Sequence, residues 1–236
     1  MIEVKITEDI DLRGKRFVTG FQGIGLVGYV SVRHIIKSLK PKKIGYIMSD
    51  SVPPVVSAEG GSVRLPFELY SKGELVLLSL ESLPVSREMQ KFCKGVTDWV
   101  IKVGLRDALL IGGLDASFAT DGNGQDYRIL CTSAARPLIT GLRTLEDGLF
   151  VVGPLALFMS MFEYNDFPAI AVLPYASRDR ADPRAAAKAI EFINDIYGVD
   201  VNTEELIADA ESIEEELRRH AAAETHGNDE SLGYIK

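Results

Sequence analysis

The sequence predicts a single α/β domain with a largely parallel sheet between helical layers. Short β-branched or leucine-rich segments alternate along most of the chain with longer segments of helical periodicity. The chain has 236 residues, of which 46% are hydrophobic and 25% charged. This balance is ordinary for a globular protein, and the length is sufficient to bury a core without disulfides or metals. A mostly disordered chain is therefore excluded.

The predicted strands are short apolar segments bounded by glycine, proline or aspartate. They lie at residues 3–6, 15–20, 43–48, 63–69, 74–80, 108–112, 127–131, 149–152 and 169–173. The segments at 63–69 and 74–80 are joined by only four residues, which predicts an antiparallel hairpin within the sheet.

The predicted helices lie between these strands, at residues 26–39, 85–103, 154–164 and 182–197. Ser86 is the predicted N-cap of the second helix. The third is apolar on nearly every side, so we expect it to be buried. The fourth begins with Asp182 as N-cap and Pro183 at its first position, and it ends at Gly198.

The C-terminal region has a different character from the predicted body at residues 1–201. Residues 202–223 are predicted to form an acidic helix with Thr203 as its cap. A narrow apolar seam runs along one side of that helix and consists of Leu206, Ala210, Ile213, Leu217 and His220. Residues 224–236 have few apolar side chains and are expected to form a flexible tail.

The charge is unevenly distributed. Residues 1–200 carry 23 Lys and Arg against 24 Asp and Glu, whereas residues 201–236 carry 3 against 10. Neither part has the basic surface that a nucleic-acid binder requires, and the acidic helix would be repelled by anionic lipid. We therefore expect a small-molecule enzyme or a protein whose partner is another protein.

The two cysteines, Cys93 and Cys131, are too few for a disulfide-rich scaffold or a four-thiolate zinc site. No apolar segment approaches the length of a membrane helix, and the acidic N-terminus does not resemble a signal peptide. A cytoplasmic, soluble protein is the expectation.

A glycine motif is the strongest indication of a ligand. Gly23, Gly25 and Gly28 follow a predicted strand and open a helix, which is the setting of a dinucleotide-binding loop, and Asp50 follows the next strand. The alternative is that these glycines allow a tight turn and close packing of helix on strand. Two extra residues before the glycines and the prolines after Asp50 favour the alternative.

No other segment forms a convincing catalytic or metal-binding set. The loop at 121–124 lacks the ligand spacing of a calcium site and is predicted to be a hairpin turn. Of three histidines, only His34 lies in the body, and no serine occupies a nucleophile elbow. We predict no catalytic residues, no metal and no cofactor; the alternative is a nucleotide- or phosphate-binding enzyme or sensor that uses the loop from Gly23 to Gly28.

Several short motifs then occur in a recognisable order: FQGIGLVG at 21–28, DSVPP at 50–54, LY at 69–70, Trp99, LIGG at 110–113, GPL at 153–155, DPRAA at 182–186 and VDVNT at 199–203 with Leu206. In this order the chain resembles the archaeal proteasome assembly chaperone family. The resemblance implies a three-layer α/β/α fold similar to that of purine nucleoside phosphorylases, without their catalytic residues. It also implies a homo-oligomer with no enzymatic activity.

The same resemblance implies a partner. Members of the family assist assembly of the proteasome 20S core, and some dock on its α subunits through a C-terminal hydrophobic–Tyr–any residue motif. This chain ends in Tyr234-Ile235-Lys236, with Gly233 before the tyrosine, so its tyrosine is third from the end. We predict these last three residues as the partner-binding element of a proteasome chaperone or adaptor, which acts on α subunits or the 20S core, alone or with a paralogue.

Overall fold

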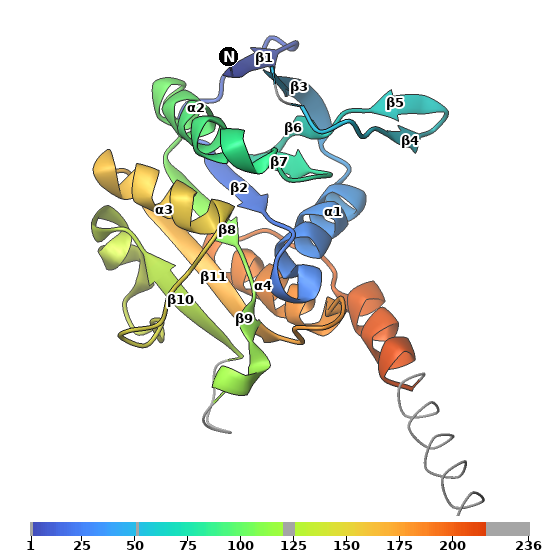
Figure 1. The fold of residues 1–236 in the computed structure, drawn as a ribbon, viewed down its shortest axis with the longest axis vertical. Helices are drawn as coiled ribbons and strands as arrows, with labels where there is room; N and C mark the ends of the chain where they lie inside the picture. The colour runs from blue at the N-terminus through green and yellow to red at the C-terminus, as the bar shows by residue number, and fades with distance from the viewer. Residues whose placement is uncertain (1, 51, 120–125, 216–236) are drawn as a thin grey trace, which may run out of the picture.

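The computed structural model describes residues 2–50, 52–119 and 126–215. One mixed β-sheet lies between two pairs of helices, and a small two-stranded hairpin projects from the body (Figure 1). The α/β fold with helices on both faces of the sheet is therefore confirmed. In the described part of the chain, no helix is long and apolar enough to cross a membrane.

The strands of the main sheet follow the order β1-β3-β6-β7-β2-β8-β11-β10, and β9 pairs with β11 beyond the end of β8. Their bounds are Ile2–Ile6 (β1), Arg16–Gly20 (β2), Lys42–Ser49 (β3), Phe67–Lys72 (β6), Leu75–Leu80 (β7), Asp107–Ile111 (β8), Leu114–Asp115 (β9), Tyr127–Cys131 (β10) and Ala169–Ala176 (β11). The projecting hairpin consists of β4 (Ser57–Glu59) and β5 (Ser62–Arg64).

The helices form the outer layers (Figure 1). On one face lie α2 (Met89–Lys102) and α3 (Pro154–Tyr164); on the other lie α1 (Val27–Leu39) and α4 (Pro183–Tyr197). Short 3-10 segments precede or link these elements at Ile24–Leu26 (η1), Ser86–Glu88 (η2), Ala116–Phe118 (η3) and Ser133–Ile139 (η4).

Strand β2 shows why the protein has two cores. Successive side chains of a strand point to opposite faces, so Phe17 packs into the core beneath α2 and α3 while Val18 packs into the core beneath α1 and α4. Both side chains are fully buried. An apolar segment without polar alternation is typical of a central strand covered on both faces.

The sheet is less parallel than predicted. Strands β7, β2, β8 and β11 are parallel neighbours, but β1, β3, β6 and β7 pair antiparallel on one flank and β10 pairs antiparallel with β11 on the other. The predicted hairpin is present as β6 and β7. Its first strand was placed too early, because Pro66 has no amide hydrogen and divides the predicted segment 63–69 between β5 and β6.

The prediction of a strand at residues 149–152 is wrong. Leu149 and Val151 are partly buried and Phe150 and Val152 are exposed, so the alternation of a strand is present. The segment nevertheless belongs to neither sheet. The outer edge of β10 is instead contacted at Ile129 by the chain around Thr144.

Helix starts follow the sequence in one case and depart from it in another. The carboxylate of Asp182 accepts a hydrogen bond from the amide of Ala185 at 3.1 Å, which confirms it as the N-cap of α4. Ser86 is not a cap, since it lies inside the 3-10 turn η2 that leads into α2. Helix α3 has the predicted bounds and is buried on one side, but Tyr164 at its end is exposed.

A candidate partner-binding groove

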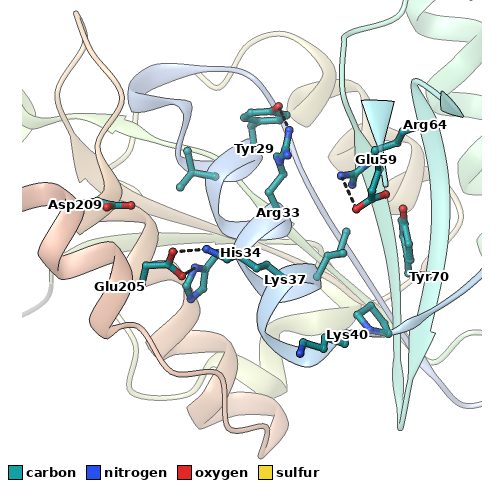
Figure 2. A pocket seen from close by; sticks show the side chains of 13 residues that line it. Tyr29, Arg33, His34, Lys37, Lys40, Glu59, Arg64, Tyr70, Glu205 and Asp209 are labelled. Carbon is teal, nitrogen blue, oxygen red and sulfur yellow. Dashed lines mark hydrogen bonds and ion pairs between the residues drawn. The ribbon is translucent and has the colours of Figure 1, made fainter. Parts of the chain in front are cut away.

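A groove of about 680 Å³ is enclosed by three separate parts of the chain. Helix α1 forms its floor, the β4–β5 hairpin and β6 form one wall, and the helix at residues 204–215 forms the other (Figure 2). Its lining side chains are Tyr29, Val30, Arg33, His34, Ile36, Lys37, Lys40, Pro41, Glu59, Arg64, Tyr70, Glu205 and Asp209.

The floor of the groove is cationic. Arg33, Lys37 and Lys40 recur at helical spacing, so they follow one side of α1 and the turn at its end. Helix α1 contains no acidic residue. Lys37 forms an ion pair with Glu205 on the opposite wall, which links the floor to the C-terminal helix (Figure 2).

The hairpin wall is built on a buried charged network. Arg64 is only 6% exposed and Glu68 only 1%, and the Nε of Arg64 lies 3.7 Å from a carboxylate oxygen of Glu68. The other end of the Arg64 guanidinium lies 3.3 Å from the carboxylate of Glu81. Glu81 in turn accepts a hydrogen bond from Arg33 of α1 at 3.0 Å. Buried charges require such partners, because an unpaired one would be strongly destabilising.

The same network fixes the protonation of its members. Burial would raise the pKa of Glu68, but hydrogen bonds from Lys43, Tyr70 and the amide of Leu65 outweigh it and hold that pKa below its ordinary value. Burial and the neighbouring Glu68 carboxylate raise the pKa of Tyr70. At neutral pH Glu68 is therefore ionised and Tyr70 is neutral.

The C-terminal wall is held by few apolar contacts. Leu206 and Ala210 of the predicted seam are buried, and Leu206 packs into the core beneath α1 and α4. The ring of His34 donates from Nε2 to the carbonyl of Asn202 at 2.7 Å, and Arg184 of α4 pairs with Glu214 at 3.1 Å. The carbonyl of Thr203 accepts a hydrogen bond from the amide of Ile207, so Thr203 stands at the predicted cap position, while the side chain of Asn202 accepts from the amide of Glu204.

The lining of the groove is of mixed charge. It contains both cationic side chains and carboxylates, and its histidine is bound to a backbone carbonyl. Within residues 2–50, 52–119 and 126–215, no cluster of His, Cys, Asp and Glu is arranged to hold a metal ion. Salt-bridged side chains around an open groove suit a polypeptide surface of mixed charge.

The glycine motif is used for packing at two of its three positions. A Cβ on Gly28 would lie 2.3 Å from the carbonyl oxygen of Ile111, and one on Gly25 would lie 2.7 Å from the Cβ of Ala176. Gly25 also has a φ of +62°. A Cβ on Gly23 would meet nothing within 4 Å, so its role is not explained by packing.

Other residues that the sequence singled out are dispersed. Cys93 is buried in α2, as expected of a small core residue, whereas Cys131 at the end of β10 is only partly buried. The predicted partner-binding residues Tyr234, Ile235 and Lys236 lie outside the described residues, as does the loop at 121–124.

Sequence reasoning missed the groove itself. Counted from the floor helix α1, the hairpin wall lies about 30 residues further along the chain and the C-terminal wall about 170, and no local motif links these segments. One signal was available, since Arg33, Lys37 and Lys40 form a cationic stripe on a helix that has no acidic residue.

Comparison with known proteins gives the family. The model of the PAC2 family matches residues 17–221. The chain belongs to the PAC2 family. Among curated proteins, an uncharacterised protein of Methanocaldococcus jannaschii is 27% identical over 217 residues, which cover 90% of this chain and 87% of that one. Proteasome assembly chaperone 2 of Homo sapiens is 30% identical over 111 residues, 43% of this chain and 42% of the human protein.

Solved structures of the PAC2 type share the fold. Pyrococcus furiosus PbaA, described as an archaeal homologue of proteasome-assembly chaperone, superposes with a TM-score of 0.79 at 22% identity and covers 98% of this chain and 96% of its own. Pyrococcus furiosus PbaB, described as an archaeal proteasome activator, has a TM-score of 0.75 at 21% identity, with 93% and 98% covered. At these identities the likeness establishes the fold.

Proposed function

We propose that this protein is a non-enzymatic proteasome assembly chaperone or adaptor that acts in the cytoplasm on the α subunits of the 20S core. The observation that carries the proposal is the family match over residues 17–221, together with relatives described as proteasome assembly chaperones. A mixed-charge groove in place of a catalytic cleft is consistent with a protein client.

Two surfaces are candidates for contact with the client. One is the groove, where Lys40 extends the cationic stripe and makes no ion pair with any described residue. The other is the terminal Tyr234-Ile235-Lys236, whose aromatic ring and free carboxylate suit capture between subunits. The helix at 204–215 lies between them in sequence and forms one wall of the groove.

Homo-oligomerisation is the second part of the proposal. Phe150 is 91% exposed and Val152 is 79% exposed, on a segment with strand-like alternation that pairs with no strand of either sheet. Such side chains are costly to leave in water, so they support a contact with another copy of the chain. The near-neutral body opposes self-association only weakly.

Native mass spectrometry of the protein alone and with purified proteasome α subunits tests both parts. We expect a mass larger than one chain for the protein alone and a further complex with the subunits. A monomer at micromolar concentration would refute the oligomer, and absence of any complex with α subunits would refute the client.

A capture experiment separates the two surfaces. The full chain, a form without residues 233–236 and the variant Lys40→Glu are each used to capture α subunits. Lys5→Glu, on the edge strand β1 away from the groove, is the matched control. Loss of capture on truncation assigns binding to the terminus, loss in Lys40→Glu assigns it to the groove, and unchanged capture in both refutes both surfaces.

The nucleotide alternative is tested on the same material. Of the three glycines of the motif, Gly23 is the one with open space beside it, so a ligand bound by the motif would contact the chain at Gly23. A nucleotide at about 100 times its Kd would add about 2.7 kcal/mol to the free energy of unfolding. A rise in melting temperature with ATP or NAD would favour an enzyme or sensor, and no rise would favour the chaperone.

A further inference from the structure

A second cavity lies at the amino ends of the central parallel strands, opposite the carboxyl ends where the glycine motif lies. It has a volume of about 460 Å³ and opens at the amino ends of β2, β8 and β11, between the end of α4 and the turn η4. Its polar lining is Arg16, Arg106, Asp107 and Tyr197. Its apolar lining includes Leu138, Ile170 and Ile196.

The polar groups form one compact cluster. Arg16 and Asp107 are register partners in β2 and β8, and their side chains form an ion pair of 2.8 Å. Tyr197, the last residue of α4, donates its hydroxyl hydrogen to the other oxygen of Asp107 at 2.9 Å. The Arg16 guanidinium lies 4.3 Å from the centre of the Tyr197 ring, which restrains it further.

The cluster has more hydrogen-bond donors than acceptors. Each guanidinium carries several N–H donors and no acceptor. In the described part of the chain, the side-chain hydrogen bonds of Arg16 and Arg106 all go to one oxygen of Asp107, at 2.8 and 3.4 Å. The Nε of Arg16 is buried and has no hydrogen-bond acceptor there. Unused donors in a cavity attract a group that can only accept hydrogen bonds.

The arrangement of charges is consistent with this. Within the lining of the cavity, the guanidiniums of Arg16 and Arg106 face one carboxylate, that of Asp107. The exposed carboxylate of Glu74 lies 3.9 Å from the Nε of Arg16 but is not part of the lining. The Asp107 side chain is only 5% exposed, and burial raises its pKa above the ordinary value despite these neighbours. A second anion placed between Arg16 and Arg106 would therefore meet cations at hydrogen-bonding range.

A cluster with only a structural role would not need all of these polar side chains. The contact between Arg16, Asp107 and Tyr197 is sufficient to tie the end of α4 to the sheet. Arg106 is not required for that contact, and its side chain is half exposed. Together with the apolar walls, it gives the cavity the features of a ligand site: a volume of a few hundred Å³ and a small number of convergent polar groups.

We propose that this cavity binds a small organic carboxylate with an apolar body, the carboxylate paired with Arg106 and Arg16 and the apolar body against Leu138, Ile170 and Ile196. The planar guanidinium matches a carboxylate with two parallel hydrogen bonds, which favours this head group. This site is independent of the proteasome function proposed above.

Isothermal titration of the full chain tests the proposal with three probes: 4-methylpentanoate, the uncharged 4-methylpentan-1-ol and inorganic phosphate. We expect the carboxylate to bind and the other two to bind at least about tenfold more weakly, since tenfold corresponds to about 1.4 kcal/mol. Equal binding of the alcohol would overturn the ionic part, and equal binding of phosphate would overturn the apolar part. No binding of the carboxylate at about 10 mM would overturn the site.

Variants locate the binding. Arg106→Gln retains the stem of the side chain and should weaken the carboxylate about tenfold or more, while Arg178→Gln, an exposed arginine paired with Asp115 elsewhere, should not. Leu138→Trp should fill the mouth of the cavity and abolish binding. Since Arg106 and Leu138 are both substantially exposed, these variants should fold, and unchanged affinity in both would place the ligand elsewhere.

Discussion

Replacing Gly28 by alanine should destabilise the protein, although alanine is normally the better helix former. A Cβ at this position would lie 2.3 Å from the carbonyl oxygen of Ile111 and 2.4 Å from the amide nitrogen of Phe21, where ordinary contacts begin near 3.4 Å. Both obstacles are backbone atoms next to central strands of the sheet, so neither can rotate away. Helix α1 or a strand end must therefore move by about 1 Å.

Two effects of opposite sign set the size of this change. Overpacking of a well-packed site costs about 1–3 kcal/mol, and a clash with backbone on two sides belongs at the upper end or beyond. The helix propensity of alanine over glycine returns at most about 1 kcal/mol. We expect a net loss of about 2 kcal/mol in the free energy of unfolding, or about 4–8 °C in melting temperature for a chain of this size.

Urea unfolding followed by circular dichroism measures the loss directly. Gly23→Ala, five residues earlier in the same glycine motif, is the control, because its Cβ would meet nothing within 4 Å and its backbone is extended with φ of −140°. We expect that control to lie within about 0.5 kcal/mol of the parent. Equal stability of the two variants would refute the close-packing explanation of the glycine motif.

Three further predictions concern single side chains. Asp182→Ala removes the N-cap of α4 and should cost about 1–2 kcal/mol in thermal unfolding; a change under about 0.3 kcal/mol would contradict the capping role. Burial raises the pKa of the Cys93 thiol to about 12, so a thiol reagent at pH 8 should modify Cys93 only on unfolding and later than the partly exposed Cys131; the reverse order would show the packing to be wrong. The pKa of Glu68 is lowered in the fold, so its ionised form stabilises the fold at neutral pH and this contribution is lost as the pH falls below 4.5 through the lowered value. Glu68→Gln should therefore be less stable at pH 7 and show a flatter acid limb, whereas a parallel pH profile would count against the network.

The layered fold could be predicted because hydrophobic periodicity and the residues that begin and end helices and strands are local features of the sequence. Asp182 and Pro183 define the start of α4, and a segment such as Phe17–Val18 that is apolar on both faces indicates a central strand. The prediction failed where pairing with a neighbouring strand decides whether a segment becomes a strand. Residues 149–152 have the alternation of a strand, yet a strand exists only when a neighbour offers its backbone, and the edge of β10 is contacted by the chain near Thr144.

The candidate site was less predictable for a similar reason. Arg64 and Glu68 are charged residues in a strand-rich segment, where sequence alone suggests a solvated surface. In the fold they are almost completely buried, because Glu81 from the end of β7 and Arg33 from α1 complete their network. Such a network depends on tertiary contacts between distant segments, and no spacing rule reveals it.

The place of β2 in the sheet has a consequence for how the chain folds. Residues 16–20 are made early, but their two neighbours are β7 and β8, which begin at Leu75 and Asp107. During synthesis, one edge of this apolar strand therefore stays unpaired until β7 ends at Leu80, and the other until β8 ends at Ile111. Parallel pairing over such separations is slow, and unpaired apolar strands are prone to aggregate. A central strand of the finished protein, buried at four of its five residues, is thus one that a nascent chain must protect until β8 has been made.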